Sequence, residues 1–454
     1  KTITVSLEQS YINAFPVNIW ENRTSEIRPP ARIFPAMVYA PDVDRVILFG
    51  GQSMLLSGSP LNDTWSYDYE TNSWTNMQPL NSPPLCTFAF ATYDIQFQKV
   101  ILLCNINFTR ETWAYDYKTN SWTNLTTGKQ PLELCPMTYD VESNVTIAYC
   151  YWGSTYKLWA YSYKNNTWWN IMTWNITTTD MMPKGDTVGL AYDSKHDKII
   201  ALLYSVSVHG YMETWSYDYN TNKWTNVTDP VYYNSSLSSF GDSITYDTRS
   251  DRIITFSGGW DEHVNWTMVY NYNMRTWKNM NPAISPSKRV GYGLVYDSQS
   301  DRIILFGGGV AEFSGETHWS SDETWVYNLP AAPFPPENLR IESAEKKVVL
   351  KWDSPLDDGG YPVKNYTIYR NNMLLVTIEN QTSYTDENVK VGENYTYKIK
   401  AINDWDASEF SNEIKVTVID EKPVIPIYGL SELSVVIVLI IVWLIYKKLG
   451  TIHK

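Results

Sequence analysis

The sequence predicts an all-β protein made of six repeated β-sheets, followed by a separate β-sandwich and one C-terminal transmembrane helix. Aromatic residues make up 15% of the 454 residues and charged residues only 19%, a balance typical of folded, β-rich chains. Two short patterns recur roughly every fifty residues through the first two thirds of the chain. The helix is indicated by a long apolar run close to the C-terminus.

The repeats consist of two patterns that follow one another. The first is an apolar strand ending in Tyr-Asp or Tyr-Ala, a short polar turn and a second apolar strand, at 37–51, 90–105, 137–151, 190–204, 244–259 and 294–308. The second has a Trp or Met, eight intervening residues and a Trp, at 63–77, 111–125, 157–171, 213–227 and 266–280. A sixth copy of the second pattern, at 322–329, holds only its first half. Such regular repeats are typical of architectures in which each unit packs on its neighbours.

These repeats resemble the kelch repeat. The resemblance rests on the double glycines 50–51, 258–259 and 307–308, the Tyr of the third strand and the Trp of the fourth. It implies a six-bladed kelch-like β-propeller in which each repeat is one four-stranded blade. A glycine pair lets the chain leave a crowded sheet with backbone angles that other residues avoid. Repeats two to four have Cys104-Asn105, Cys150-Tyr151 and Leu203-Tyr204 instead, so we expect their turns to differ.

The sixth repeat lacks its fourth strand in the sequence. Pro330 and Pro333 follow where the chain would pair again, and proline cannot donate to a strand ladder. The N-terminal segment NIWENRT, 18–24, looks like the fourth-strand segment NSWTNM, 72–77. We therefore expect residues 1–332 to form one propeller closed by the N-terminal strand, which would leave no exposed sheet edge.

A proline-rich hinge at 331–338 precedes a change to alternating strands rich in Lys and Glu. This part, assigned to 333–421, resembles a fibronectin type III domain over nearly its whole length. The resemblance implies core positions for Trp352 on the second strand and Tyr366 on the third. It also implies that Tyr395 is a corner tyrosine whose hydroxyl bonds to backbone upstream.

Residues 422–454 are predicted to be a transmembrane helix and a short basic cytoplasmic tail. The run Ile427–Tyr446 contains only one charge, Glu432, and two lysines follow it. At about 1.5 Å per residue, its length matches a hydrocarbon core of about 30 Å. The lysines place the tail in the cytoplasm and the preceding domains outside the cell. The chain begins at Lys1, which we interpret as the mature form after removal of a secretory signal.

Sequons support an extracellular location. Thirteen Asn-x-Ser/Thr sites occur, against about six expected by chance, so glycosylation is predicted. The sites are Asn22, Asn62, Asn107, Asn124, Asn144, Asn165, Asn175, Asn226, Asn234, Asn265, Asn365, Asn380 and Asn394. We expect some of them to be structural turn residues. The richness in Asn, Tyr, Ile and Lys is also typical of archaeal exported proteins.

All four cysteines lie in the second and third repeats. An even number in an exported protein favours disulfides over free thiols, and no CxxC spacing suggests zinc. Cys135 and Cys150 are symmetric about a predicted hairpin turn, which favours their pairing and leaves Cys86 with Cys104. The alternative pairs Cys104 with Cys150, which hold equivalent positions in adjacent repeats.

Composition and motifs exclude several functions. The net charge of −13 leaves no basic footprint for nucleic acid. The chain contains no GxSxG, no HExxH and no phosphate-binding loop, so no catalytic residue, metal or cofactor is predicted. An exported carbohydrate-active enzyme, or an oxidase like the copper radical oxidases among kelch propellers, stays open as the alternative.

The candidate binding residues lie in the loops between the second and third strands of repeats four to six. Three of the five histidines occur there, together with aromatic residues and with acids that include Glu213 and Glu323 at the loop ends. The predicted ligand-binding residues are Trp260, Trp266, Trp319, Tyr211, His209, His263, His318, Asp261, Glu262 and Glu316. They favour binding of a protein or a glycan, for adhesion, envelope assembly or membership of a membrane complex. Unrelated solvated loop residues, or a cation site, are the alternative interpretations.

Overall fold

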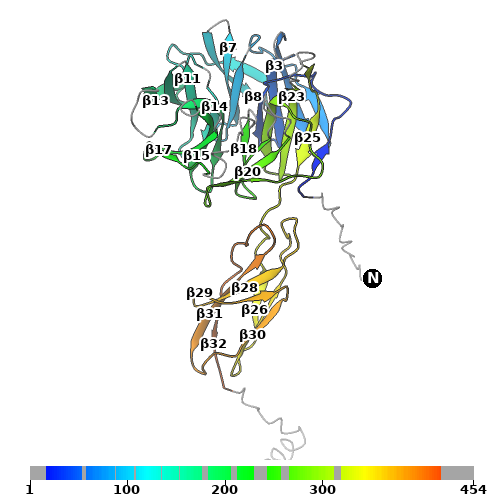
Figure 1. The fold of residues 1–454 in the computed structure, drawn as a ribbon, viewed down its shortest axis with the longest axis vertical. Coiled ribbons are helices and arrows are strands. Elements are labelled where there is room, and N and C mark those ends of the chain that lie inside the picture. The colour runs from blue at the N-terminus through cyan, green and yellow to red at the C-terminus, as the bar shows by residue number, and fades with distance from the viewer. Residues whose placement is uncertain are drawn as a thin grey trace, which may run out of the picture. The chain divides into compact units, whose positions relative to one another are not determined.

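The computed structural model describes residues 17–53, 58–86, 88–106, 109–133, 135–152, 154–175, 182–205, 212–229, 243–256, 265–310 and 319–420. These residues form strands, turns and loops, with no helix among them (Figure 1). The chain divides into two compact units, the first made mainly of residues 1–332 and the second mainly of 333–358 and 363–454. The protein is therefore all-β in the part that the structure describes.

The first unit contains six small antiparallel sheets, called sheets 1 to 6 in chain order. Sheet 1 consists of β2 (Ala36–Ala40), β3 (Arg45–Gln52), β4 (Pro60–Asp68) and β5 (Ser73–Asn76). Sheet 2 consists of β6 (Ala89–Asp94), β7 (Lys99–Ile106), β8 (Thr109–Asp116) and β9 (Ser121–Asn124). Sheet 3 consists of β10 (Met137–Asp140), β11 (Val145–Trp152), β12 (Thr155–Ser162) and β13 (Thr167–Asn175).

The remaining three sheets repeat this order. Sheet 4 consists of β14 (Gly185–Asp193), β15 (Lys198–Ser205), β16 (Met212–Asp218) and β17 (Lys223–Asn226). Sheet 5 consists of β18 (Ile244–Asp247), β19 (Arg252–Phe256), β20 (Thr267–Asn271) and β21 (Thr276–Asn279). Sheet 6 consists of β22 (Val290–Asp297), β23 (Arg302–Val310), β24 (Trp319–Ser320), β25 (Thr324–Tyr327) and β1 (Trp20–Asn22).

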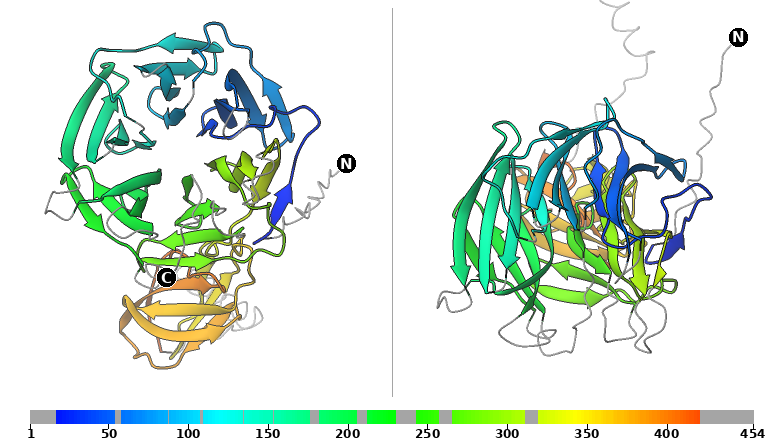
Figure 2. Two further views of the ribbon diagram at one scale, coloured as in Figure 1. Left: turned by 45° about the horizontal axis from the view of Figure 1, so that its top comes forward. Right: turned by 90° about the horizontal axis from the view of Figure 1, so that it is seen from above.

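The six sheets stand around a common centre, with the first strand of each sheet innermost (Figure 2, left). Each first strand contacts the first strand of the next sheet, in the order β2, β6, β10, β14, β18 and β22. Strand β22 also contacts β2, which brings the sixth sheet against the first.

Strand β1 supplies the outer strand of sheet 6. It pairs antiparallel with β25, and Trp20 lies opposite Tyr327. The same register joins Trp74 to Tyr67 in sheet 1 and Trp277 to Tyr270 in sheet 5. The N-terminal strand therefore holds the position of the fourth strand that is missing after β25.

The hairpin turns explain why tyrosine, aspartate and asparagine recur in every repeat. In five of the six sheets, the hydroxyl of the first-strand tyrosine donates to the residue five positions later, as from Tyr192 to Asp197 at 2.9 Å, whereas Tyr93 of sheet 2 donates to Asp42 of sheet 1. The acceptor has a positive φ, 52° at Asp197, which aspartate and asparagine tolerate better than most residues. Third-strand tyrosines do the same, as from Tyr67 to Asn72 at 2.8 Å.

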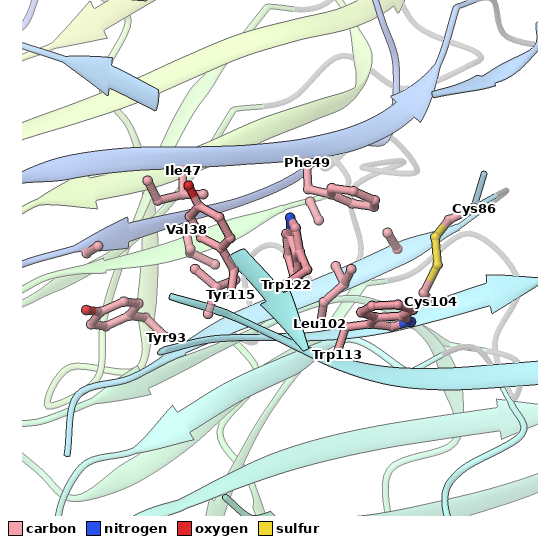
Figure 3. Packing of buried hydrophobic residues seen from close by; sticks show 14 residues of the cluster. Val38, Ile47, Phe49, Cys86, Tyr93, Leu102, Cys104, Trp113, Tyr115 and Trp122 are labelled. Carbon is pink, nitrogen blue, oxygen red and sulfur yellow. A yellow bond between two sulfur atoms is a disulfide. The ribbon is translucent and has the colours of Figure 1, made fainter. Parts of the chain in front are cut away.

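The core lies between neighbouring sheets and is rich in aromatic rings. Figure 3 shows the cluster between sheets 1 and 2, where Trp122 packs edge-on against Phe49 with ring centroids 5.1 Å apart. The indole Nε1 of Trp122 donates to Thr64 Oγ1 of sheet 1 at 3.0 Å. The aromatic bulk thus fills the space between sheets, while the polar indole atom is satisfied across the interface.

The second unit has the two sheets of a β-sandwich. One contains β26 (Glu337–Ser343), β27 (Val348–Asp353) and β30 (Ser383–Asp386). The other contains β29 (Met373–Glu379), β28 (Asn365–Arg370), β31 (Asn394–Ile402) and β32 (Ile414–Thr417).

The structure confirms the three residue assignments made for this unit. Trp352 on β27 and Tyr366 on β28 are buried in one core cluster. The hydroxyl of Tyr395 accepts a hydrogen bond from the backbone N–H of Lys390 at 3.1 Å, which is the expected corner contact.

The predicted transmembrane segment 427–446 lies outside the described residues, as do residues 1–16. Within the described ranges, the structure has no helix of the length and apolarity needed to cross a membrane.

Candidate binding face and central cavity

The ends of the second strands and the starts of the third strands lie at equivalent places in all six sheets, so they share one face of the ring. We call this the loop face. The connections there are short in sheets 2 and 3, at 107–108 and 153–154. They are longer in sheet 1, at 53–59, and in sheets 4 to 6, at 206–211, 257–266 and 311–318.

Most of the predicted binding residues lie outside the part of the chain that the structure describes. This group contains His209, Tyr211, Trp260, Asp261, Glu262, His263, Glu316 and His318. Their mutual arrangement stays a prediction. For Trp319, only the backbone is described, and it pairs with Val310 at the end of β23.

Trp266 has a different role from the one that its sequence position suggests. Its side chain is partly buried and packs against a hydrophobic cluster that includes Met212, Tyr246 and Met268. Part of its ring is therefore used for packing sheet 4 against sheet 5. An alanine at this position is expected to affect the fold as well as any ligand contact.

The acidic residues that begin the third strands are internal hydrogen-bond acceptors. In four sheets, a carboxylate accepts from the indole Nε1 of the tryptophan two positions later. The distances are 2.6 Å for Asp63 and Trp65, 2.8 Å for Glu111 and Trp113, 2.8 Å for Glu213 and Trp215, and 3.0 Å for Glu323 and Trp325. The sequence groups Glu213 and Glu323 with the acids of the binding loops, but these contacts give them a structural role.

Buried arginines tie two of these acids to the glycine pairs. Arg32 donates to Gly50 O at 2.9 Å and to both Asp63 oxygens, at 2.7 and 2.8 Å. Burial would raise the pKa of Asp63, but hydrogen bonds from Arg32 outweigh it and hold the pKa below its ordinary value. The same contacts recur in sheet 6.

In sheet 6, Arg289 donates to Gly307 O at 3.0 Å and to Glu323 at 2.7 Å. There too, burial would raise the pKa of Glu323, and the hydrogen bonds from Arg289 and Trp325 lower it. We call each arrangement of arginine, glycine carbonyl and carboxylate an arginine clamp.

The structure contains the two disulfides that the sequence favours, Cys86–Cys104 and Cys135–Cys150. Cys86 stands seven residues before the first-strand Tyr93, as Arg32 does before Tyr39 (93 − 86 = 39 − 32 = 7). Cys104 stands eleven residues after Tyr93, as Gly50 does after Tyr39 (104 − 93 = 50 − 39 = 11). The first disulfide therefore replaces the arginine clamp in sheet 2.

The second disulfide shares one end of this place in sheet 3, since Cys150 follows Tyr139 by the same eleven residues (150 − 139 = 11), whereas Cys135 precedes Tyr139 by four residues and not by seven (139 − 135 = 4). Glu133 lies beside these two sulfurs, and the three residues have the spacing of a metal site. Both sulfurs are consumed by the disulfide, so this group does not offer thiolate ligands.

Eleven of the thirteen sequon asparagines lie in the described ranges, and the ten whose exposure is described, all but Asn175, are exposed or partly exposed. In three of them, a hydrogen bond of the asparagine side chain explains why the fold requires asparagine at that position. The side-chain oxygens of Asn22, Asn124 and Asn226 accept from the backbone N–H of the threonine two positions later, at 3.0, 2.8 and 2.9 Å. Asn76 and Asn279 make the same turn without a sequon.

Those three threonines are structural too. Thr24, Thr126 and Thr228 accept hydrogen bonds from the backbone N–H groups of Thr324, Thr112 and Thr214. Part of the sequon enrichment thus follows from the requirements of the fold.

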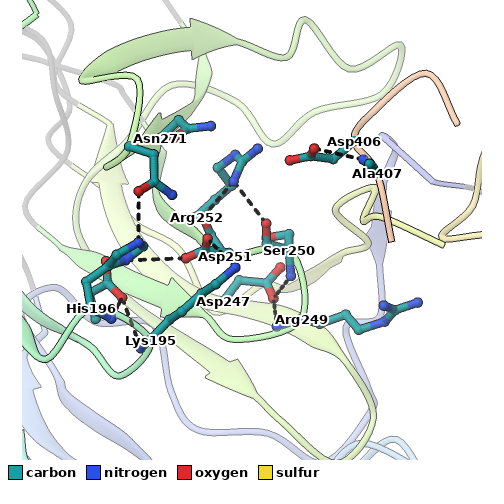
Figure 4. A network of polar contacts seen from close by, with 12 residues as sticks. Lys195, His196, Asp247, Arg249, Ser250, Asp251, Arg252, Asn271, Asp406 and Ala407 are labelled. Atoms are coloured by element: carbon teal, nitrogen blue, oxygen red, sulfur yellow. Dashed lines mark hydrogen bonds and ion pairs between the residues drawn. The ribbon is translucent and has the colours of Figure 1, made fainter. Parts of the chain in front are cut away.

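A polar cluster joins sheets 4 and 5 on the face opposite the loops, which we call the turn face (Figure 4). His196 Nδ1 lies 2.8 Å from Asp193 Oδ2, and its Nε2 lies 3.0 Å from Asn273 Oδ1. Asp193, His196 and Asp251 are close enough together to hold a metal ion. However, Ser300 makes the same contact to Asp297 in sheet 6, so a capping role explains His196 without a metal.

A cavity of about 560 Å³ runs between the six first strands. It is lined by residues of every sheet, among them the tyrosines Tyr39, Tyr93, Tyr139, Tyr192, Tyr246 and Tyr296. In the sequence, these tyrosines are only signs of the repeat. Each tyrosine lies at the end of the innermost strand of its sheet, and this recurrence is the sequence feature by which the cavity lining could have been found.

Comparison with known proteins identifies two modules. Residues 334–417 match the family model of the fibronectin type III domain, and residues 44–81 match that of the kelch motif. A titin homolog of Caenorhabditis elegans is 33% identical over 101 residues, which is 21% of this chain and 0% of that protein. Chitinase 63 of Streptomyces plicatus is 35% identical over 89 residues, 19% of this chain and 14% of the enzyme. The chain thus spans far less than two thirds of either relative.

Solved structures share only a small part of the chain. The twitchin kinase region of C. elegans is 27% identical, with a TM-score of 0.20, and the match covers 21% of this chain and 18% of that one. A family 28 exopolygalacturonase of Yersinia enterocolitica is 17% identical, with a TM-score of 0.17, over 19% and 21% of the two chains. The chain therefore combines a kelch motif in its first unit with a fibronectin type III domain in its second.

Proposed function

We propose that the first unit is a six-bladed kelch-like β-propeller and that it is the binding module of a membrane-anchored, glycosylated extracellular protein. The contacts between successive first strands, including that of β22 with β2, support the propeller. The pairing of β1 with β25 supports its closure by the N-terminal strand. In this proposal, the fibronectin type III domain is a spacer and residues 427–446 are the anchor.

The disulfides support the extracellular location. Both join strands or segments within one sheet, and the first occupies the place where other sheets have an arginine clamp, so they belong to the folded architecture. Structural disulfides form and persist in oxidising compartments. The exposure of the described sequon asparagines agrees with access for glycosylation. An archaeal source is part of the proposal and rests on composition alone.

The long loops of sheets 4 to 6 carry the proposed binding role. Loops held on a rigid sheet scaffold are common recognition elements, and the three adjacent sheets present theirs on one face. The proposed partner is a protein or a glycan of the cell surface, engaged for adhesion, envelope assembly or assembly of a membrane complex. The observation that carries this proposal is that these loops are longer than those of sheets 2 and 3 and contain histidine or aromatic residues, which the loop 53–59 of sheet 1 lacks.

The test uses the full chain with Trp260→Ala and Trp319→Ala combined, leaving Trp266 intact because of its packing. Retention of the purified protein on isolated cell envelopes should fall at least tenfold, as expected when two aromatic anchors are lost. Met274→Ala, at a side chain that is 70% exposed in the turn after β20, is the control and should bind like the parent. Equal retention of the double variant and the parent would overturn the assignment and make the fibronectin type III domain the better candidate.

A further inference from the structure

The turn-face end of the central cavity has a rim with two chemically different halves. The rim residues stand two positions after the six first-strand tyrosines, and all of them line the cavity. In order around the ring they are Pro41, Ile95, Val141, Ser194, Thr248 and Ser298. Sheets 1 to 3 therefore contribute an apolar half and sheets 4 to 6 a hydroxyl half.

These side chains are available to a ligand. Ile95 is 44% exposed and Val141 is 39% exposed, although both are large and apolar. Ser194, Thr248 and Ser298 are exposed as well, and the Thr248 hydroxyl, which donates to the Tyr296 hydroxyl at 3.5 Å, can still accept from a ligand. Each hydroxyl can donate one hydrogen bond and accept others.

The groups just inside the rim disfavour charged ligands. No lysine or arginine occurs among the described residues that line the cavity. Behind the rim, the carboxylates of Asp140 and Asp297 accept hydrogen bonds from the backbone of their own turns, at 2.9 Å from Ser143 and 3.1 Å from Ser300. These acids would repel an anion, and a cation would have to compete with the turns for them.

We propose that this mouth binds a neutral pyranose sugar. The C–H face of the ring would lie against Pro41, Ile95 and Val141, and its hydroxyls would bond with Ser194, Thr248 and Ser298. A pyranose matches the rim because it combines an apolar face with hydroxyls that both donate and accept. The cavity volume of about 560 Å³ falls within the range of roughly 300–1,000 Å³ typical of small-ligand sites. The site is separate from the loop face and does not depend on it.

The experiment measures binding of methyl hexopyranosides to the purified full chain in a detergent without a sugar headgroup. Saturation-transfer NMR detects weak binding, and calorimetry gives the affinity. Ser194→Ala, Thr248→Val and Ser298→Ala combined should weaken binding at least tenfold, because the ligand hydroxyls lose their partners. Ile95→Gln with Val141→Gln should weaken sugar binding as well, because it removes the apolar contacts without creating a sequon.

Two control variants test whether the sugar binds at this mouth. Gln299→Ala changes an exposed neighbour of Ser298 that does not line the cavity, and it should bind like the parent. The loop-face variant Trp260→Ala with Trp319→Ala should also keep the sugar affinity, even if it loses envelope binding. If the triple variant unfolds, Ser298→Ala alone replaces it, with a smaller expected loss.

Absence of saturable binding of every hexopyranoside at millimolar concentration would overturn the proposal. Parent-like affinity in the rim variants would also overturn it, because the sugar would then bind elsewhere.

Discussion

The indole Nε1 of Trp20 donates a hydrogen bond to Oγ1 of Thr267, 247 positions away in the sequence, at 2.7 Å. Trp20 lies on β1 of sheet 6 and Thr267 begins β20 of sheet 5. Equivalent bonds run from Trp74 to Thr324, Trp122 to Thr64, Trp168 to Thr112 and Trp277 to Thr214. The N-terminal strand thus makes the same link to the preceding sheet as the fourth strands do.

Removal of this strand is expected to destabilise the whole first unit. Deletion of residues 1–24 would remove a buried tryptophan and expose β25 as an edge, so we expect aggregation or a large loss of melting temperature. Differential scanning calorimetry checks this. An unchanged melting curve would show that β1 is dispensable.

The hydrogen bond itself can be tested with a natural control. In sheet 4 the fourth-strand Trp224 is buried, but its Nε1 has no hydrogen-bond partner among the described residues, because sheet 3 has Leu158 where the other sheets have threonine. Trp20→Phe should therefore cost about 1 kcal/mol more than Trp224→Phe, since both lose similar volume but only one loses a bond. Leu158 is fully buried, so Leu158→Thr loses apolar packing in any background, but it should cost about 1 kcal/mol less in the parent than in Trp224→Phe, because only Trp224 can donate to the new hydroxyl. Equal costs for the two tryptophan variants would contradict the account.

An arginine clamp should partly replace the disulfide of sheet 2, which stands where sheets 1 and 6 have such a clamp. Cys86→Ala with Cys104→Ala should lower the free energy of unfolding by about 3 kcal/mol, the value expected for a loop of this length. Cys86→Arg with Cys104→Gly should recover part of that loss, because Glu111 stands in sheet 2 where Asp63 stands in sheet 1. Thermal unfolding with and without reductant measures both variants. If the Arg-Gly variant were no more stable than the Ala-Ala variant, an arginine clamp could not replace the disulfide in sheet 2.

The repeats could be located from the sequence because structural contacts require particular residues at fixed spacings. The Tyr-Asp strand ends and the fourth-strand tryptophans serve hydrogen bonds that recur in nearly every sheet, as from Tyr192 to Asp197. Symmetry about a hairpin turn favoured the pairing of Cys135 with Cys150 that the structure contains, while Cys104 with Cys150 stayed open as the alternative. These features could be predicted because their contacts join residues at fixed spacings in the sequence.

The roles of the acids and of the cavity were harder to see. Glu213 and Glu323 look like binding residues because they border the loops, yet the recurring acid-Thr-Trp triplet marks them as structural. A sequence count of sequons likewise could not separate glycosylation from the turn that Asn124 and Thr126 make. The cavity depends on which strand of each sheet is innermost, and that follows only from the packing of all six.

The proposed membrane anchor gives a direct prediction. A chain ending near Glu421 should be secreted as a soluble protein, because the one apolar segment of membrane-spanning length has been removed. Fractionation with a carbonate wash checks this, and the full chain is the control. Membrane retention of the truncated chain would mean that the anchor has been misplaced or that a membrane partner holds the protein.

Asp247 at the end of β18 should make stability depend on pH. Burial, together with the nearby Asp301, raises its pKa to about 7, and its side chain accepts from the backbone N–H groups of Arg249 and Ser250. The folded protein therefore holds this proton more tightly than the unfolded chain, whose aspartates titrate near 3.9. The resulting stabilisation is complete below about pH 4 and is lost as pH rises through about 7, by at most about 4 kcal/mol.

Asp247→Asn keeps the acceptor oxygen for both N–H groups but cannot ionise. Relative to this variant, the parent should lose melting temperature between about pH 4 and 7, and the variant should be the more stable of the two at pH 8. Glu70→Gln, at an exposed site of sheet 1, serves as the control and should follow the parent at every pH. A constant difference between parent and Asp247→Asn across this range would mean that Asp247 is ionised in the folded protein throughout, and that its turn stabilises the charge despite burial.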